Sequence, residues 1–322
     1  MLPHLISPQT EIYEPVNEGE EKRLKNLFKT WDGGDADVGL IGVPFDYGII
    51  AGGGRPGAKQ GPDAIRQAIK RFGGSYFIEH DINISELSLV DCGDIDVVAD
   101  DLLATHARLT EIVKSLLERS ILPIILGGGH DLSFATIRAL VEHSTTPIGG
   151  INVDAHLDVR PVVNNIISSG TPFWRALETF PDRFLADRFV EMGMVGNSNA
   201  QTHCDYILNK GVSLTTLDKL RLDGVSDVFR AALDVAGDDA FFSIDIDVVQ
   251  QAFAPGCSAP APLGVTPEEI TAMAFYAGQA PSIKLFDLME VSPPYDQDGR
   301  TARLAAAIIG YFLAGFVTRK SR

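Results

Sequence analysis

The segment Pro147–Pro161, "PIGGINVDAHLDVRP", changes abruptly from an apolar run to a series of polar residues. Its apolar part, Ile148–Asp154, predicts a strand buried on both faces, which is typical of parallel sheets. Asp154, His156 and Asp158 then follow at every second position. Side chains at this spacing on an extended backbone project to the same side. The segment therefore predicts a buried strand that ends in a row of metal-ligating side chains.

Similar apolar runs recur along the chain and alternate with segments of helical periodicity. This alternation indicates an α/β fold, in which a mostly parallel sheet has helices on both faces. The predicted strands are Val38–Pro44, Leu87–Cys92, Leu122–Leu126, Ile148–Asp154, Phe189–Val195, Val212–Thr215, Ala240–Ile246 and Ser282–Glu290. The predicted helices lie at residues 61–72, 105–120, 132–143, 171–180, 225–237, 266–279 and 304–317.

The domain organisation predicted from this pattern is simple. No stretch rich in Pro, Gly or Ser interrupts the alternation, so we expect residues 38–322 to form one domain. Residues 1–37 are polar and charged and predict a surface arm with one helix around Glu20–Phe28. The apolar stretch Leu304–Val317 is shorter than the roughly 18 residues that indicate a membrane span, so we expect a buried helix there.

Composition limits the classes of partner. The 322 residues carry a formal net charge of −16, which argues against binding to nucleic acids or to anionic membranes. The N-terminal "MLPHLISPQTEIYEP" lacks the basic start and apolar core of a signal peptide. Three cysteines without metal-type spacing are too few for a disulfide framework. We therefore expect a protein of a reducing compartment, the cytoplasm, that acts on a small molecule.

Other candidate ligands also follow predicted strands. His130 comes after the strand that ends at Leu126, Asp245 and Asp247 end another strand, and Glu290 ends the last one. Because functional groups of parallel sheets gather beyond the carboxyl ends of the strands, we expect all of them at one edge with the Asp154 segment. So many carboxylate and imidazole groups in one place would repel or be costly to bury without cations.

The chemistry of these groups favours a particular kind of metal site. Carboxylate and imidazole ligands without a thiolate favour a divalent ion such as manganese over a structural zinc. Two ions about 3.5–4 Å apart can share bridging carboxylates and one water, whose pKa falls towards roughly 7. A site for a single metal that uses only some of these groups is the alternative, and an isolated Asp-x-Asp pair is common by chance.

Two further features have less specific interpretations. The loop "GGGHD" at Gly127–Asp131 lacks the Lys-Ser/Thr ending of a phosphate-binding P-loop, so its glycines are expected to let the backbone approach the metals. His106 and His143 lie in helical stretches and are expected to be ordinary packing or surface residues. Cys257 is expected to be a packed thiol of its loop.

Four motifs together resemble those of the ureohydrolase superfamily, which includes arginases, agmatinases and formimidoylglutamases. They are "GGGHD" (127–131), "NVDAHLDVR" (152–160), "SIDIDVVQQAFAPGCSAPAPLG" (243–264) and "EVSPPYDQDGRTARLAA" (290–306), and the likeness extends from about Asp37 to the C-terminus. The resemblance implies a three-layer α/β/α fold with a central, mostly parallel sheet of eight strands and two Mn²⁺ ions per chain. It also implies a homo-oligomer, a trimer or hexamer, with a dimer or monomer as the alternative. The metal ligands that it implies are His130, Asp154, His156, Asp158, Asp245 and Asp247.

The resemblance also implies a reaction. Enzymes of this superfamily attack a planar C=N carbon with a metal-bound hydroxide and expel an amine. Asp158 is implied to orient the hydroxide as well as to bind metal. Glu290 is implied to pair with the guanidinium or amidinium group of the substrate. These two residues are the expected catalytic groups.

The substrate is indicated by a departure from the superfamily pattern. Arginases and agmatinases carry a proton-shuttling His before the glycine of a His-Gly pair, where this chain has Ser169 before Gly170. "SSGTPF" and "APGCSAPAP" instead look like formimidoylglutamase, which converts N-formimidoyl-L-glutamate and water to L-glutamate and formamide. An agmatinase or another urea-releasing hydrolase of guanidino compounds is the alternative, and a noncatalytic member of the superfamily is a third possibility.

Four residues are candidate substrate contacts. Arg160 lies two residues beyond a metal ligand and is predicted to bind the substrate's carboxylates, with a salt bridge to the acidic rim as the alternative. Ser169 and Gly170 are expected beside it because they occupy the loop that determines the substrate. Arg175 is a weaker second candidate, with a helix surface as the alternative.

Overall fold

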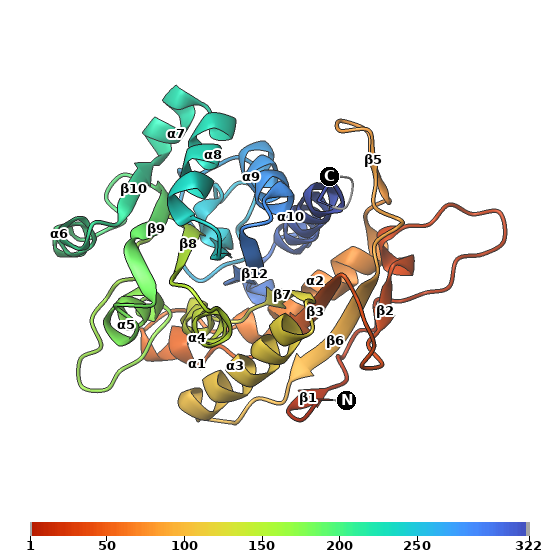
Figure 1. The fold of residues 1–322 in the computed structure, drawn as a ribbon, viewed down its shortest axis with the longest axis horizontal. Coiled ribbons are helices and arrows are strands. Elements are labelled where there is room, and N and C mark those ends of the chain that lie inside the picture. Colours follow the sequence, from red (N-terminus) through yellow and green to blue (C-terminus); the bar gives the residue numbers. More distant parts are fainter. Residues whose placement is uncertain (1, 320–322) are drawn as a thin grey trace.

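A computed structural model describes residues 2–319 and contains one large sheet (Figure 1). All eight predicted strands are present and run parallel to their neighbours in the order β6-β3-β7-β12-β11-β8-β9-β10. Their bounds are β3 (Val38–Gly42), β6 (Leu89–Ile95), β7 (Leu122–Leu126), β8 (Ile148–Val153), β9 (Phe184–Met194), β10 (Ser213–Thr216), β11 (Ala240–Asp245) and β12 (Ile283–Met289). The predicted fold class is therefore confirmed.

The N-terminal segment extends this sheet. Strand β1 (Leu5–Ile6) pairs antiparallel with β6, and β2 (Phe28–Thr30) pairs parallel with it, so the sheet has ten strands. The helix predicted around Glu20–Phe28 is wrong, since only a single 3-10 turn forms there, at Leu24–Asn26. Leu24, Leu27 and Phe28 have helical spacing and are buried, but the backbone from Phe28 onwards pairs with β6 instead.

Helices cover both faces of the sheet (Figure 1). One face packs against α2 (Gly61–Arg71), α8 (Val225–Ala236), α9 (Pro267–Gln279) and α10 (Arg300–Val317). The other face packs against α3 (Leu102–Glu118), α4 (Ser133–His143) and α5 (Pro172–Thr179). The remaining α-helices of the described residues are α1 (Tyr47–Ala51), α6 (Gln201–Lys210) and α7 (Leu217–Asp223), and β4 (Tyr76–Phe77) and β5 (Ile82–Asn83) form a small hairpin.

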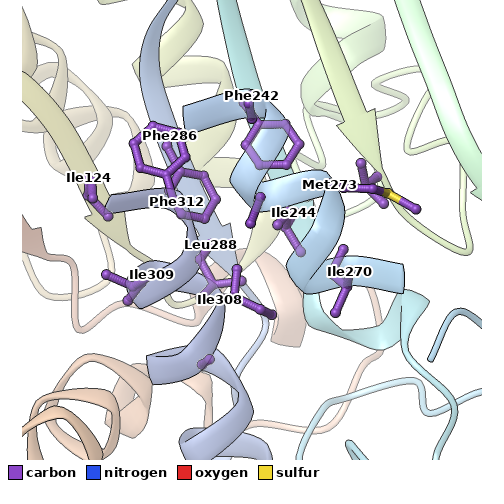
Figure 2. Packing of buried hydrophobic residues seen from close by; sticks show 14 of the residues in the cluster. Ile124, Phe242, Ile244, Ile270, Met273, Phe286, Leu288, Ile308, Ile309 and Phe312 are labelled. Carbon is purple, nitrogen blue, oxygen red and sulfur yellow. The ribbon is translucent and has the colours of Figure 1, made fainter. Parts of the chain in front are cut away.

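Alternate residues of each central strand enter opposite cores, as a pleated strand requires. In β7, Ile124 faces the core under α10, whereas Ile125 faces the core under α3 and α4. Figure 2 shows the first core, where Phe286 of β12 stacks between Phe242 of β11 and Phe312 of α10 at centroid distances of 5.2 and 4.9 Å. This packing fixes the two strands whose ends carry Asp245 and Glu290.

Helix α10 begins at Arg300 rather than at Leu304 and has 18 residues. The expected length was therefore wrong, whereas the expectation of a buried helix is confirmed. By length and composition, α10 is the one helix within residues 2–319 that qualifies as a span, but 67% of it is buried inside the protein. It packs along α9 and α2, as the core helix of a folded domain with this length and composition does.

Candidate metal centre

Four neighbouring strands, in the order β7-β12-β11-β8, bring the candidate ligands together at one edge of the sheet. His130 begins a 3-10 turn, η3 (His130–Leu132), that follows β7, and Glu290 directly follows β12. Asp245 ends β11, and Asp154 directly follows β8. Because all four strands are parallel, these residues leave the sheet at the same edge. In Figure 1, β7 and β12 lie near the centre of the molecule, and β8 lies beyond them on the side of β9.

The first group of ligand atoms surrounds the imidazole of His130. Its Nδ1 lies 3.3 Å from Asp154 Oδ2, 3.2 Å from Asp158 Oδ2 and 3.3 Å from Asp245 Oδ2. One ligand atom from each of these four residues lies within 4.8 Å of all the others. All four side chains are buried or nearly so. This spacing fits the coordination of one cation.

The second group surrounds His156. Its Nδ1 lies 3.5 Å from Asp154 Oδ1 and 3.2 Å from Asp247 Oδ2. Asp154 therefore belongs to both groups, with one carboxylate oxygen in each. The two groups therefore share one carboxylate, as a site for two cations requires.

Several atoms of this centre lack the partners that buried polar atoms usually have. Within residues 2–319, His130 Nδ1, Asp154 Oδ2 and Asp247 Oδ1 are buried and form no hydrogen bond. Such atoms are rare in folded proteins because each one loses its hydration without compensation. Nitrogen and carboxylate oxygen ligands without a thiolate match the preference of manganese. The residues present therefore fit the two Mn²⁺ ions predicted, although their binding of metal stays a prediction.

The electrostatics of the centre also favour cations. Burial and the neighbouring Asp154 raise the pKa of Asp245 to about 6. Burial and Asp245 likewise raise the pKa of Asp247 well above its usual range. Burial alone would lower the pKa of His156, but the carboxylates of Asp247 and Asp154 outweigh it and raise that pKa to about 12. The negative charge of the clustered aspartates therefore favours bound protons on His156 and on neighbouring carboxylates. Metal cations would neutralise the same charge.

Three contacts fix the orientation of His130. Its Nε2 lies 3.0 Å from the hydroxyl of Ser243 on β11, and its main-chain N–H donates to Glu290 Oε1 at 2.9 Å. The ring of Phe173 packs edge-on against the imidazole, with the centroids 5.3 Å apart. Together these contacts direct Nδ1 towards the three aspartates. Ser243 begins the motif "SIDIDVVQQAFAPGCSAPAPLG" and Phe173 ends "SSGTPF", but the sequence alone assigned neither residue a role.

The segment that follows β8 is held by side-chain hydrogen bonds to its backbone. Asp154 Oδ1 accepts from the N–H of His156 at 2.7 Å. Asn199, in the loop before α6, accepts from the N–H of Leu157 and donates to the carbonyl of Ala155, each at 2.9 Å. Asn199 lies far away in sequence and belongs to no recognised motif, so sequence reasoning missed it.

Asp158 and Glu290 have φ angles of 46° and 68°, unusual values for residues other than glycine and often found at functional sites.

The structure brings three of the predicted substrate contacts together. The N–H of Arg160 donates to the carbonyl of Gly170 at 2.8 Å, and that of Ser169 donates to the carbonyl of Gly48 in α1 at 3.1 Å. Residues 161–169 form a hairpin between these contacts, with Asn164 and Asn165 at its tip in left-handed conformation (φ 53° and 60°). We call the Arg160–Gly170 hydrogen bond the neck of this hairpin.

The side chain of Arg160 is exposed and packs over Gly170, where an added Cβ would lie 2.9 Å from Arg160 Cδ. Within residues 2–319 it forms no ion pair, so the predicted alternative of a salt bridge to the acidic rim is not found there. Arg160 therefore stands two residues after Asp158 with an exposed guanidinium and no ion-pair partner among the described residues.

Arg175 is placed differently from both predictions. It is 9% exposed, so it does not lie on a helix surface. Its guanidinium lies 3.7 Å above the ring of Phe134, and its Nη1 lies 3.4 Å from Nδ1 of the buried His106. These contacts lie in the interior between α3, α4 and α5. We therefore leave Arg175 out of the substrate site proposed below.

Arg55 is a further residue that sequence reasoning missed. Its Nε donates to the carbonyl of Ser258 at 2.9 Å and its Nη2 to the carbonyl of Cys257 at 2.8 Å, while its guanidinium stacks on Tyr295. It thereby ties the glycine-rich loop after α1 to the loop after β11. Cys257 is fully buried, in agreement with the prediction of a packed thiol.

Comparison with known proteins agrees with this architecture. The sequence model of the arginase family matches residues 36–315. The chain belongs to the arginase family. A relative within this family, the formimidoylglutamase of Halalkalibacterium halodurans, is 34% identical over 307 residues, which are 94% of each chain.

Two solved structures of other proteins have the same fold. A crystal structure of Trypanosoma cruzi formiminoglutamase with Mn²⁺ superposes with a TM-score of 0.88 at 35% identity, and the match covers 93% of this chain and 99% of that one. Proclavaminate amidino hydrolase from Streptomyces clavuligerus superposes with a TM-score of 0.82 at 29% identity, covering 95% and 99%. The resemblance to the ureohydrolases is thereby confirmed.

Proposed function

We propose that this arginase-family protein hydrolyses N-formimidoyl-L-glutamate to L-glutamate and formamide with the help of two manganese ions. The observation that carries the proposal is the bipartite cluster of acids and imidazoles, which is followed, two residues after Asp158, by Arg160, a cation without an ion-pair partner within residues 2–319. The substrate has matching charges, since its amidine head is cationic and its tail carries two carboxylates. The likeness to formimidoylglutamases over most of the chain supports the same substrate.

Each ligand group would hold one ion. His130, Asp158 and Asp245 would hold the first, His156 and Asp247 the second, and Asp154 would bridge them. When bound, a pair of such ions polarises the reacting groups and lowers the pKa of a shared water to roughly 7. The overall reaction adds water across the C=N bond of the formimidoyl group. The bond from its carbon to the glutamate nitrogen then breaks, and the hydroxyl proton of the adduct moves to that nitrogen.

The chain's own residues orient the substrate. Glu290 is the acid next to the cluster, and its carboxylate would accept hydrogen bonds from the amidinium N–H groups. Asp158 accepts a hydrogen bond from the attacking water and so points it at the formimidoyl carbon. Arg160 binds the carboxylates of the tail, and its guanidinium fork suits this because it donates two parallel hydrogen bonds.

Hydrolysis of a guanidino compound is the second candidate. Proclavaminate amidino hydrolase shares the fold at 29% identity, and its name indicates an amidino substrate of another kind. The same scaffold therefore occurs in enzymes that act on different substrates. Agmatine has no carboxylate, however, and would leave Arg160 without a partner. Ser169 also stands where arginases and agmatinases have a histidine. Both residues favour the formimidoyl substrate.

A substrate panel tests the proposal. Purified, manganese-loaded protein is incubated with N-formimidoyl-L-glutamate, N-formimidoylglycine and agmatine, and formamide and urea are quantified. We expect formamide from N-formimidoyl-L-glutamate, a higher KM for the glycine compound, which has one carboxylate fewer, and no urea. Urea from agmatine without formamide from N-formimidoyl-L-glutamate would refute the proposal. The Asp154→Ala variant, purified in parallel, controls for contaminating enzymes.

The remaining expectations concern the state of the protein in the cell. We propose a homo-oligomer in the cytoplasm that acts on a small molecule and binds neither nucleic acid nor membranes. Light scattering after gel filtration gives the oligomeric state. A noncatalytic member of the family would take up less than one manganese ion per chain after gentle loading, which metal analysis of the same sample measures.

A further inference from the structure

Asp131, the residue after the candidate ligand His130, has a fully buried carboxylate. Its Oδ2 accepts a hydrogen bond from His106 Nε2 at 2.8 Å. Its Oδ1 packs against two glycines, since a Cβ added to Gly48 or Gly129 would lie 2.1 or 2.5 Å from that oxygen. The carboxylate therefore fits only because both positions lack a side chain, and it fixes the η3 turn against α1.

His106 connects this carboxylate to Arg175. The Nδ1 of its ring lies 3.4 Å from Arg175 Nη1. Because arginine can only donate, Nδ1 must accept, and the ring proton must lie on Nε2, from which it is donated to Asp131. Burial lowers the pKa of His106, which is consistent with a neutral ring. Arg175, His106 and Asp131 therefore form a directed chain of hydrogen bonds between a buried cation and a buried anion.

Arg175 has few other ways to compensate its buried charge. Its guanidinium stacks on Phe134 of α4, and burial lowers its pKa to about 10. Within residues 2–319 it forms no direct ion pair, and Asp131 is the carboxylate whose charge acts on it. A buried cation is costly unless an anion lies nearby. Loss of either Arg175 or Asp131 would therefore leave the other charge buried without compensation.

The chain of hydrogen bonds touches the site on two sides. Two residues before Arg175, Phe173 of α5 packs against the His130 ring and donates its N–H to the carbonyl of Asp158 at 3.3 Å. At the other end, the carbonyl of Gly48, which lies against Asp131, accepts the N–H of Ser169. Phe173 thus holds the ligand His130 and the backbone of Asp158, and Gly48 holds the hairpin of residues 161–169.

We propose that Arg175, His106 and Asp131 are positioning residues that hold the η3 turn and helix α5 so that His130 faces its metal ion. This proposal rests on the manganese centre proposed above. Residues that orient metal ligands through hydrogen bonds typically change metal affinity by about 10- to 100-fold when removed. We expect the effect to be confined to one ion, because the contacts of this network reach His130 and Asp158 of the first ligand group, whereas His156 and Asp247 belong to the second.

Manganese binding, measured from the electron paramagnetic resonance signal of free Mn²⁺, separates this role from a merely structural one. His106→Phe keeps a ring of similar size but can neither accept from Arg175 nor donate to Asp131. We expect this substitution to lower the affinity for one of the two Mn²⁺ ions by about 10- to 100-fold and to leave the affinity for the other unchanged. His106→Gln retains a donor for Asp131 and is expected to restore much of the affinity. Arg175→Met provides the same test if His106→Phe fails to fold, since Arg175 touches no ligand.

Arg183→Met is the matched control. Arg183 donates to the carbonyls of Val141 and Ser144 at the far end of α4, so its loss lowers stability away from the site. We expect a lower Tm but two ions bound as in the unsubstituted protein. If His106→Phe and Arg175→Met lower Tm yet bind both ions with unchanged affinity, the positioning role is refuted while the metal centre stands. If the unsubstituted protein itself binds no Mn²⁺, the proposed metal centre fails, and the positioning role fails with it.

Discussion

The main-chain N–H of His130 donates a hydrogen bond to the carboxylate of Glu290 at 2.9 Å. The residue that starts one ligand group is thereby joined to the acid proposed to bind the substrate, across the ends of β7 and β12. The hydrogen bond uses one carboxylate oxygen of Glu290 and leaves the other for the substrate. The two functions of this side chain, support of the metal turn and recognition of the amidinium, can therefore be separated by substitution.

Glu290→Gln is expected to retain the metal ions and lose most of the activity. Its amide oxygen can still accept from His130, but the negative charge that pairs with the amidinium is gone. We expect kcat/KM for N-formimidoyl-L-glutamate to fall about 100-fold, a typical loss for one electrostatic contact in a catalytic site. Kinetics and metal analysis of the same preparation measure both effects. Glu290→Ala, which also removes the acceptor, should lose metal as well, and equal metal loss in both variants would contradict the separation.

Asp154 and Asp247 are expected to differ in how much metal their loss removes. Asp154 contributes one oxygen to each ligand group, whereas Asp247 belongs only to the group of His156. Asp154→Ala should therefore abolish binding of both ions, and Asp247→Ala should leave about one ion per chain. Both variants should lose nearly all turnover. Metal content by mass spectrometry decides, and two retained ions in Asp154→Ala would show that this carboxylate is no bridge.

Manganese uptake is expected to release protons. The carboxylates of Asp247 and Asp154 raise the pKa of His156 to about 12, so without metal this imidazole carries a proton between pH 7 and 9. It must lose that proton before a nitrogen can coordinate, so the affinity for Mn²⁺ should rise with pH. Calorimetric titration in two buffers of different ionisation enthalpy counts the released protons. An identical enthalpy in both buffers would contradict this prediction.

Arg160→Ala is expected chiefly to raise KM, because the residue binds the substrate's tail and not its reacting carbon. Loss of a charge-assisted contact of about 1.5–3 kcal/mol corresponds to a KM increase of roughly 10- to 100-fold. The KM for N-formimidoylglycine should change less. An unchanged KM for N-formimidoyl-L-glutamate would refute the assigned role.

Gly170→Ala offers a milder test of the same contact. The added Cβ would lie 2.9 Å from Arg160 Cδ, so the flexible side chain must move although its charge remains. We expect a rise in KM of about tenfold or less with little change in Tm. Kinetics and thermal unfolding measure the two quantities. A large loss of stability without a KM effect would show that Gly170 serves the backbone and not the position of Arg160.

Arg66 is expected to be important for stability and not for catalysis. Its fully buried guanidinium donates to Asp91 at 2.9 and 3.0 Å and to Asp94 at 2.6 Å. Arg66→Met leaves two buried carboxylates without their cation, which typically costs about 3–5 kcal/mol. Arg108→Met removes an exposed ion pair with Asp96 and should cost about 1 kcal/mol or less. Urea unfolding compares the two, and equal losses would contradict the prediction.

Strands and candidate ligands could be predicted from the sequence because the relevant signals are local. A strand such as β8 is buried on both faces, so its apolar run is continuous, and its ligands follow at the next positions. The N-terminal strands could not be predicted, since β1 and β2 are short and exist through their pairing with β6. The position of Arg175 was also missed, because it depends on how α5 packs against α3 and α4, and helical spacing alone does not distinguish a buried face from a surface.

The hairpin of residues 161–169 is closed at its neck by the hydrogen bond between Arg160 and Gly170. A loop whose ends are joined in this way can gain or lose residues at its tip while both ends keep their places. Changes in length or polarity near Asn164 and Asn165 should therefore leave the ligands at the sheet edge where they are. The hairpin tip is accordingly a part of this scaffold that can diverge without loss of the metal centre.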